Sequence, residues 1–209
     1  MIPYRYIVIE GNIGAGKTSL VQKLAADIHA RIVLEEFADN PFLPKFYDQP
    51  ERYAFPLELG FLAERFSQLT REISQPELFG QPVVSDYFIN KCQIFAKNNL
   101  DGDEYELFLR LFSMVQAQIP KPDLLVYLYL DVENLQRNIR RRGREYEKKI
   151  TDEYLDNIQQ QYLEFIRQHE HMRVLVLDTN NLDFVNKNSD YLNMKKNILA
   201  EYPVGVHRI

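Results

Sequence analysis

Residues 11–18 read G-N-I-G-A-G-K-T, an unbroken G-x-x-x-x-G-K-[ST] motif. Its glycines allow a turn so tight that successive backbone N–H groups point at the oxygens of a polyphosphate. Lys17 adds a cation near the transferred group, and the hydroxyl of Thr18 can bind Mg²⁺. The motif therefore supplies eight candidates for nucleotide binding: Gly11, Asn12, Ile13, Gly14, Ala15, Gly16, Lys17 and Thr18.

The segments on either side of this motif suit the same chemistry. The apolar residues 6–10 before it predict a strand, and residues 19–29 after it carry apolar side chains at helical spacing. A helix that begins at the loop directs its N-terminal dipole at a bound anion. The alternative is a glycine-rich turn between strand and helix that binds no nucleotide.

Glu35 and Glu36 form an acidic pair at the end of the second apolar run. A carboxylate at a strand end could accept the proton of a hydroxyl group held in line with the phosphate over Lys17. Both could instead be solvated loop acids, as most carboxylates are.

A cluster of basic residues reads R-N-I-R-R-R-G-R-E-Y-E-K-K over residues 137–149. Arginine binds phosphate oxygens with two donors at once, so a basic lid over the phosphate loop would stabilise the transferring charge and exclude water. Taken alone, such a charge run is more often a solvated helix end. Its combination with a phosphate loop favours the lid.

Glu58 and Arg65 lie seven residues apart in a segment with helical periodicity, residues 53–73. Seven residues are two helical turns, so both side chains would lie on one face and could reach one pocket. A solvated pair and a structural ion pair are the alternatives.

Length, composition and charge favour a single domain, residues 1–209, acting on small molecules. A chain of 209 residues that is 45% hydrophobic can bury a core without metal or disulfide support, and its net charge of −5 does not attract nucleic acid or an anionic membrane. We expect no membrane span. The single cysteine, Cys92, and the absence of a signal sequence predict a reducing cytoplasm. The four histidines show no spacing that indicates a transition metal.

Apolar runs alternate with helical patterns along the chain. The expected strands are residues 6–10, 32–35, 82–85, 124–130 and 173–177, and the expected helices are 19–29, 53–73, 88–98, 103–117, 132–141 and 152–169. This alternation predicts an α/β fold of the P-loop NTPase type, a five-stranded parallel sheet with helices on both faces. Ligands bind beyond the carboxyl ends of such strands. Residues 186–209 are polar, and their pattern leaves their structure open.

The order of motifs resembles the deoxynucleoside kinase family, in particular the bacterial deoxyadenosine and deoxyguanosine kinases. The resemblance covers residues 6–184. Besides the phosphate loop, it depends on four segments that read I-V-L-E-E-F-A-D-N-P-F-L, F-Y-D-Q-P-E-R-Y-A-F, I-F-A-K-N and R-R-R-G-R-E-Y-E. The phosphate loop is common to many NTPases, whereas this sequence of segments is much more specific.

The resemblance implies ATP and Mg²⁺ as cofactors, a deoxynucleoside as the acceptor and a homodimer as the assembly. It makes Glu35 the catalytic base, with Glu36 as a second choice, and makes Lys17, Arg142 and Arg144 charge stabilisers. It also implies roles in binding the two substrates. Tyr47 and Glu147 would hold the sugar 3′-hydroxyl, Phe95 would stack on the base and Arg65 would read its edge. The loop with Asp183 and Phe184 would pack on the adenine of ATP.

Glu58 departs from the family pattern, in which a glutamine contacts the base. A carboxylate only accepts hydrogen bonds, whereas an amide also donates. Because guanine offers adjacent N1–H and N2–H donors, Glu58 together with Arg65 favours deoxyguanosine over deoxyadenosine.

A second departure lies at the end of the third expected strand, where relatives have an acid, an arginine and a serine. This chain reads V-V-S-D-Y-F over residues 83–88, so either Ser85 or Asp86 occupies the position of the acid. The arginine is missing in both alignments. We assign Asp86 with Thr18 to the metal, and Lys91 or a lid arginine could replace the missing cation.

The sequence therefore predicts ATP-dependent phosphorylation of the 5′-hydroxyl of a deoxynucleoside, a purine, in nucleotide salvage. Two alternatives stay open. One is a nucleoside monophosphate kinase of the thymidylate kinase type, although two acids near the acceptor would repel a second phosphate. The other is a nucleotide-binding module that is catalytically weakened, as the missing arginine suggests.

Overall fold

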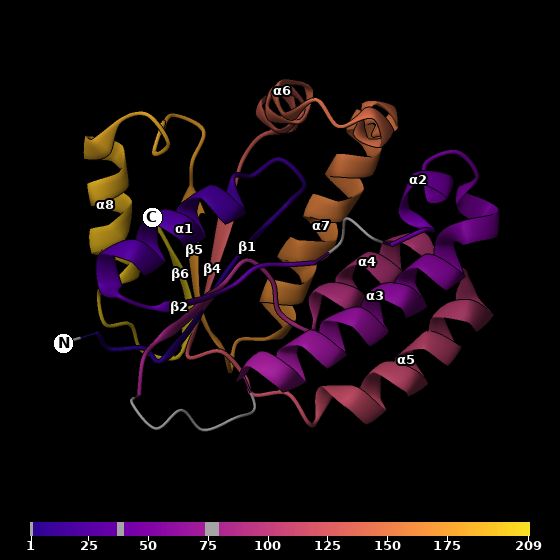
Figure 1. The fold of residues 1–209 in the computed structure, drawn as a ribbon, viewed down its shortest axis with the longest axis horizontal. Helices are drawn as coiled ribbons and strands as arrows, with labels where there is room; N and C mark the ends of the chain where they lie inside the picture. The colour runs from indigo at the N-terminus through magenta and orange to yellow at the C-terminus, as the bar shows by residue number, and fades with distance from the viewer. Residues whose placement is uncertain (1, 37–39, 74–79) are drawn as a thin grey trace.

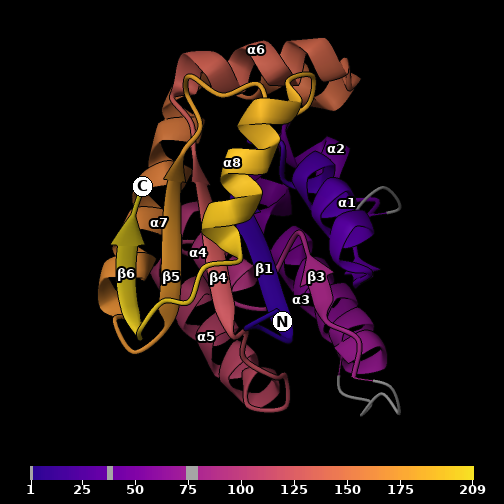
Figure 2. The same cartoon turned by 90° about the vertical axis from the view of Figure 1, so that its left-hand side faces the viewer.

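Parallel strands form one sheet at the centre of the computed structural model, which describes residues 2–36, 40–73 and 80–209. Six strands form it in the order β2-β3-β1-β4-β5-β6, and every pairing is parallel. Their bounds are β1 Tyr6–Gly11, β2 Arg31–Val33, β3 Val83–Ser85, β4 Leu124–Tyr129, β5 Arg173–Asp178 and β6 Gly205–Arg208. Figure 1 views the sheet nearly edge-on, between its two layers of helices, and Figure 2 shows its strands side by side.

The predicted count of five strands was wrong, because β6 adds a sixth at the edge of the sheet. Its residues pair with β5, from Arg173 opposite Gly205 to Val176 opposite Arg208. The segment G-V-H-R has no apolar run, and three of its four residues are half-buried. An edge strand is covered less than a central one, so the buried-strand pattern used for the other five did not find it.

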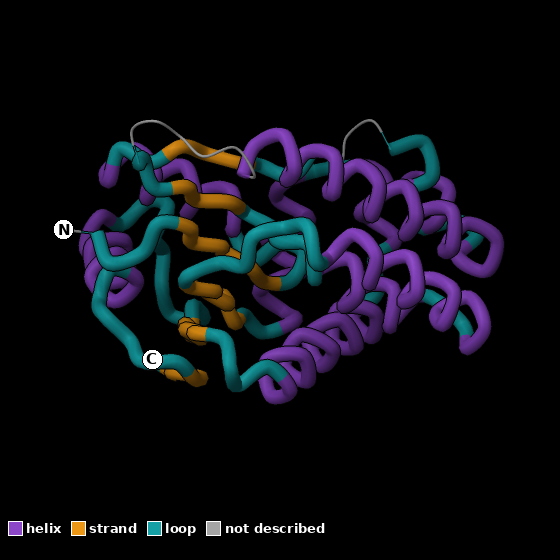
Figure 3. Tube along the Cα trace, turned by 90° about the horizontal axis from the view of Figure 1, so that it is seen from below, coloured by secondary structure: helices purple, strands orange, loops and turns teal. Residues whose placement is uncertain are grey.

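Helices cover both faces of the sheet, as the alternation of strands and helices predicted (Figure 3). Their bounds are α1 Lys17–Ile28, α2 Leu43–Phe46, α3 Pro50–Ile73, α4 Lys91–Asn99, α5 Gly102–Gln116, α6 Val132–Arg142, α7 Asp152–Gln168 and α8 Asn188–Ile198, with a 3₁₀ helix η1 at Glu145–Lys149. In the described ranges, no helix is long and apolar enough to cross a membrane.

Alternate side chains of each central strand enter two separate cores. In β4, Leu125 and Tyr127 pack with α3, α4, α5 and α7, whereas Leu124, Val126 and Leu128 pack with α1 and α8. Side chains of a strand alternate between its two faces, so each strand must be apolar throughout to fill both cores. This requirement explains the continuous apolar runs in the sequence.

The carboxyl ends of the strands gather the functional loops at one edge of the sheet. The phosphate loop follows β1, and Asp86 follows β3 directly. Helix α6 lies across the ends toward which the strand arrows point (Figure 2). Gly11 is required where β1 meets β4, because a Cβ atom on it would lie 2.9 Å from the carbonyl oxygen of Leu128.

Candidate active site

The phosphate loop turns tightly at two of its glycines. Gly14 and Gly16 have φ angles of 86° and 87°, in the left-handed region that favours glycine. The Nζ atom of Lys17 donates hydrogen bonds to the carbonyl oxygens of Gly11 and Asn12, at 2.9 and 3.0 Å. Burial, followed by the charge of Lys91, lowers the pKa of Lys17 to about 8.

Two of the eight predicted loop residues lie outside the cavity lining. Gly11 and Asn12 do not line the cavity, whereas Ile13 to Thr18 do. The Asn12 side chain donates to the carbonyl oxygen of Leu155 at 2.7 Å and accepts from Ile13 N at 2.8 Å. Asn12 therefore ties the loop to α7.

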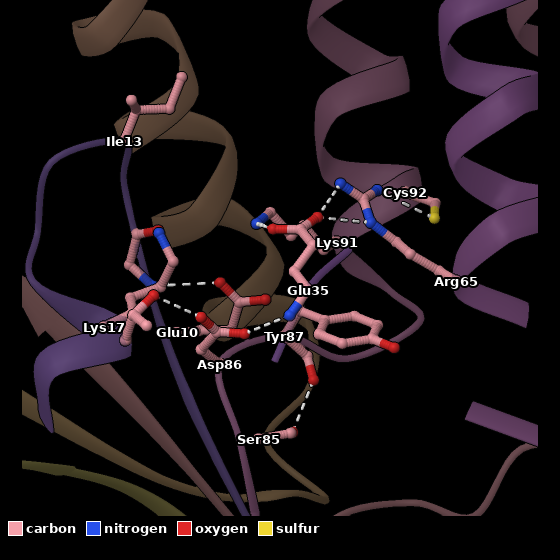
Figure 4. A network of polar contacts seen from close by, with 12 residues as sticks. Glu10, Ile13, Lys17, Glu35, Arg65, Ser85, Asp86, Tyr87, Lys91 and Cys92 are labelled. Atoms are coloured by element: carbon pink, nitrogen blue, oxygen red, sulfur yellow. Dashed lines mark hydrogen bonds and ion pairs between the residues drawn. The ribbon is translucent and has the colours of Figure 1, made fainter. Parts of the chain in front are cut away.

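Asp86 joins the phosphate loop to the acidic loop after β2. Its Oδ2 atom accepts from the Thr18 hydroxyl at 2.6 Å, and its Oδ1 atom accepts from Glu35 N at 2.8 Å (Figure 4). Ser85 instead donates to the carbonyl oxygen of Tyr87 at 2.7 Å. Of the two sequence alignments, the geometry therefore favours the one that makes Asp86 the acid beside the phosphate loop.

Thr18 and Asp86 present oxygen atoms only, and both residues line the cavity. Hydroxyl and carboxylate oxygens are the donors that a hard cation such as Mg²⁺ prefers, with substrate phosphates completing its coordination. Their chemistry fits the predicted magnesium site. Within the described ranges, no three His, Cys, Asp or Glu side chains form a cluster of their own for a metal ion.

Glu35 is held between two cations (Figure 4). Arg65 donates from Nε and Nη2 to Oε1, at 2.8 and 2.5 Å, and Lys91 Nζ contacts Oε2 at 2.5 Å. The Glu35 side chain is only 10% exposed. Burial opposes its ionisation, but the charges of Arg65 and Lys91 outweigh that effect and lower the pKa of Glu35 to about 2.

Lys91 provides a cation where the sequence lacked the arginine. Tyr87, one of the residues aligned with that arginine, is buried and donates to Gln68. Lys91 comes from the first turn of α4 and is itself buried. Glu36, the second choice for the base, is 72% exposed and forms an ion pair with Arg71 at 3.7 Å, away from the cavity.

Glu58 lies at the other end of the same cavity. It is 1% exposed, its Oε1 atom accepts from Asn99 Nδ2 at 2.7 Å, and its Oε2 atom has no hydrogen-bond partner among the described residues. Burial raises the pKa of Glu58 to about 7, against the smaller effects of Asn99 and Arg65. Arg65 lines the cavity on the same face of α3, as the spacing predicted.

Sequence reasoning missed Asn99, although a signal was present. Lys91, Phe95 and Asn99 are spaced by four residues, so they lie along one face of α4. All three line the cavity. The same spacing argument that placed Glu58 and Arg65 on one face of α3 predicts a shared face for these three residues of α4.

The basic lid folds as the end of α6, the left-handed Gly143 and helix η1. Glu147 is 4% exposed and accepts from Arg142 Nε at 2.9 Å and Nη2 at 2.7 Å, and from Arg144 Nη1 at 3.1 Å. Tyr47 stacks on the ring of Tyr146 with centroids 6.2 Å apart. The lid residues thus meet Tyr47 over the cavity.

The late loop also reaches the phosphate loop. A Cβ atom on Gly16 would lie 2.8 Å from Cζ of Phe184, so the phenylalanine ring packs directly on the loop backbone. Lys23 Nζ donates to the carbonyl oxygen of Phe184 at 2.8 Å. Asp183 lines the cavity beside Phe184, and its carboxylate accepts from Asn186.

One cavity of about 770 Å³ connects these groups. Of the predicted site residues, Gly11, Asn12 and the second-choice base Glu36 do not line it. Its walls hold a phosphate loop, an ionised acid beside two cations, and a second buried acid bonded to an amide.

Comparison with known proteins agrees with this geometry. Residues 7–202 match the profile of the family described as deoxynucleoside kinase. The chain belongs to the deoxynucleoside kinase family. It is 36% identical over 190 residues to a deoxyguanosine kinase of Bacillus subtilis, covering 89% of this chain and 92% of the relative. It is 33% identical over 204 residues to a deoxyadenosine/deoxycytidine kinase of the same organism, covering 93% and 91%.

A solved structure of deoxyadenosine kinase from M. mycoides with bound dCMP and dCDP has the same fold, with a TM-score of 0.80 at 23% identity. The alignment covers 92% of this deoxynucleoside kinase and 98% of that chain. The predicted resemblance, the α/β fold and the assignment as a deoxynucleoside-phosphorylating kinase are therefore confirmed. The thymidylate kinase alternative gains no support from these relatives.

Proposed function

We propose that this kinase transfers the terminal phosphoryl group of ATP to the 5′-hydroxyl of a purine deoxynucleoside, deoxyguanosine or deoxyadenosine. The observation that carries the proposal is the continuity of one cavity from the phosphate loop, past Glu35, to Glu58 and Phe95. A nucleoside with its base at Glu58 would present its sugar hydroxyl to Glu35. Phosphoryl transfer depends mainly on such positioning and on neutralising charge.

In this proposal Glu35 orients the 5′-hydroxyl and accepts its proton. Its ionised state supports the role, although both oxygens are held by cations and proton transfer must weaken one of these contacts. Lys17 and the lid residues Arg142 and Arg144 stabilise the charge of the transferring group. The lid arginines must exchange their contacts with Glu147 for phosphate oxygens when ATP binds.

Thr18 and Asp86 would hold Mg²⁺ beside the ATP phosphates. When bound, the ion neutralises charge on the phosphate oxygens. The short contact between the Thr18 hydroxyl and Asp86 supports a shared site for these two side chains.

Recognition of the nucleosides is distributed over the rest of the cavity. Tyr47 and Glu147 would hold the sugar 3′-hydroxyl, and the edges of the base would meet Glu58 and Arg65 while Phe95 stacks on it. The buried position of Glu147 within the lid supports this role. Asp183 and Phe184 would pack on the adenine of ATP.

A purine acceptor is favoured by the relatives and by Glu58. The two Bacillus subtilis relatives are a deoxyguanosine kinase and a deoxyadenosine/deoxycytidine kinase. We further propose a single domain of residues 1–209 with a lid at 137–149, a homodimeric assembly and a cytoplasmic location. The net charge of −5 supports small-molecule partners, without nucleic acid or membrane.

The proposal is tested by incubating the protein with labelled ATP, Mg²⁺ and each of the four deoxynucleosides in turn. Transfer to deoxyguanosine or deoxyadenosine, well above transfer to the two pyrimidines, is expected. Deoxynucleoside monophosphates serve as competing acceptors in a parallel set. Preferential transfer to a monophosphate, or none to any nucleoside, would contradict the proposal.

A weakened binding module is the second candidate, because the arginine after β3 is missing. However, Lys91 Nζ lies 2.5 Å from the carboxylate of Glu35, so a cation is present there. This contact argues against a loss of catalysis for want of a cation. Calorimetry distinguishes the two: tight binding of ATP and nucleoside without product would favour the module.

A further inference from the structure

Glu58 is a buried acid whose hydrogen bonds are incomplete. It is 1% exposed, and the only hydrogen bond it receives within the described ranges comes from the neutral amide of Asn99. Its Oε2 atom has no partner in the described part of the chain. Because Glu58 lines the cavity, this buried and unpartnered oxygen can bond a base once the side chain shifts toward it.

The charged groups around Glu58 are occupied elsewhere. Arg65, on the same helix α3, donates to Glu35 and to Cys92 Sγ. Lys91 from α4 contacts Glu35. The titratable groups Cys92 of α4 and Tyr154 of α7 are also neighbours, and burial is the main cause that raises the pKa of each, with a smaller contribution from the charge of Glu58.

Helices α2 and α5 also pack on α3. Of their described residues, Leu43 and Phe46 of α2 line the cavity, and no acidic or basic side chain of either helix does. Tyr47, which follows α2, contributes a phenol whose pKa is raised well above its usual value by burial. Glu58 therefore faces the base end of the cavity without a cation that bonds to it.

A buried carboxylate without a bonded cation binds a proton readily, because the neutral acid is easier to bury than the anion. Consistent with this geometry, burial raises the pKa of Glu58 to about 7. Both forms are then populated near neutral pH. The ionised form only accepts hydrogen bonds, whereas the protonated form donates one and accepts others.

We propose that the protonation state of Glu58 selects the purine base. Ionised Glu58 accepts from N1–H and N2–H of guanine, and protonated Glu58 donates to N1 of adenine while it accepts from the N6 amino group. The proposal rests on the proposed function, since it assumes that the base lies at this end of the cavity. One side chain thus serves both purines, with guanine favoured as pH rises.

The two bound forms differ by one proton, so the preference for guanine over adenine changes by up to tenfold for each pH unit. Across an interval from about pH 6 to about pH 8.5, which brackets the pKa of Glu58, we expect at least a tenfold rise in the preference. Guanine N1 keeps its own proton throughout this interval.

The experiment is a competition between deoxyguanosine and deoxyadenosine in one mixture with ATP and Mg²⁺. The ratio of the two products at early times gives the ratio of their kcat/KM values. Effects of pH on ATP, on the metal and on the shared transfer step cancel in this ratio. The expected result is a ratio that rises with pH for the unmodified protein.

Two variants connect the change to Glu58. Glu58→Gln cannot ionise, so its product ratio should not vary with pH and should favour adenine relative to the unmodified protein at high pH. Asn99→Ala removes the amide donor that favours the ionised form, so the rise should move to higher pH. A constant ratio in the unmodified protein, or a rise that persists in Glu58→Gln, would overturn the proposal.

Failure of the proposed function is recognised separately, because neither nucleoside is then phosphorylated. In that case calorimetric affinities of the two nucleosides at both pH values provide the same ratio. An affinity ratio that does not vary with pH would overturn the role of Glu58.

Discussion

The two ends of the cavity contain two buried glutamates in opposite electrostatic settings. At the phosphate end, Glu35 is bonded to Arg65 and Lys91, and its pKa falls to about 2. At the other end, Glu58 is bonded to the amide of Asn99, and burial raises its pKa to about 7. Both side chains are almost removed from water, so the bonded partners account for the difference.

The contrast shows that one pocket can assign two tasks to the same residue type. A carboxylate that stays ionised suits the role proposed for Glu35, which is to position a hydroxyl group and accept its proton. A carboxyl group that titrates near neutral pH can present either hydrogen-bonding pattern to a base. Substitutions at Glu35, Lys91 and Glu58 each remove one side of this contrast.

Replacing Glu35 should have the largest effect. Glu35→Gln removes the acceptor of the hydroxyl proton, so kcat should fall by about 10²–10⁴-fold, measured in steady state with saturating ATP. Because two buried cations lose their counter-charge, folding is checked by circular dichroism, and Glu35→Asp provides a variant that keeps the charge. Glu36→Gln is the control, since Glu36 is exposed and outside the cavity, and it should keep full activity. Full activity in Glu35→Gln would end the assignment of Glu35 as the base.

Replacing Lys91 should make Glu35 behave more like Glu58. In Lys91→Met, kcat/KM should fall by roughly 10²-fold, as on loss of a charge-stabilising donor. The lowered pKa of Glu35 should rise by about 1–2 units, so the acid limb of the kcat/KM profile should move to higher pH.

Lys91→Arg should restore much of the activity because it keeps the charge. Lys97→Met, on the same helix, removes an exposed pair with Glu164 and serves as the matched control. If the two methionine variants lose the same activity, or if the acid limb of Lys91→Met stays in place, Lys91 has only a packing role.

The smallest expected effect is the effect of Glu58 on the stability of the ligand-free protein. Its folded-state pKa of about 7 lies above the usual 4.5, so the folded protein binds this proton more tightly than the unfolded chain. The resulting stability is complete below about pH 4.5 and is lost as pH rises through about 7. As pH rises from about 5 to about 8.5, the unmodified protein should therefore lose about 2 kcal/mol of unfolding free energy that Glu58→Gln does not lose.

Urea denaturation of the two ligand-free proteins at several pH values measures this difference. The comparison isolates Glu58, because all other titrating groups are common to both proteins. A difference in unfolding free energy that is independent of pH would show that Glu58 does not titrate in this range.

The phosphate end could be predicted from sequence because its parts are contiguous. Glycine spacing, Lys17 and Thr18 lie in one segment between a strand and a helix, and the backbone itself makes the anion site. The strands that carry it are apolar throughout because both faces are covered, so the parallel sheet could also be read from the chain. The spacing of Glu58 and Arg65 along α3 predicted a shared face in the same way.

Only the tertiary structure decided how side chains from separate elements pair. It brought Lys91 of α4 and Arg65 of α3 to opposite oxygens of Glu35, left Glu36 in solvent, and set Asp86 beside Thr18. It also paired β6 with the edge of the sheet, where the chain has no apolar run. A pKa or a strand pairing depends on groups distant in sequence, whereas a backbone loop and a helix face depend on near neighbours, and near neighbours are what the sequence alone determined.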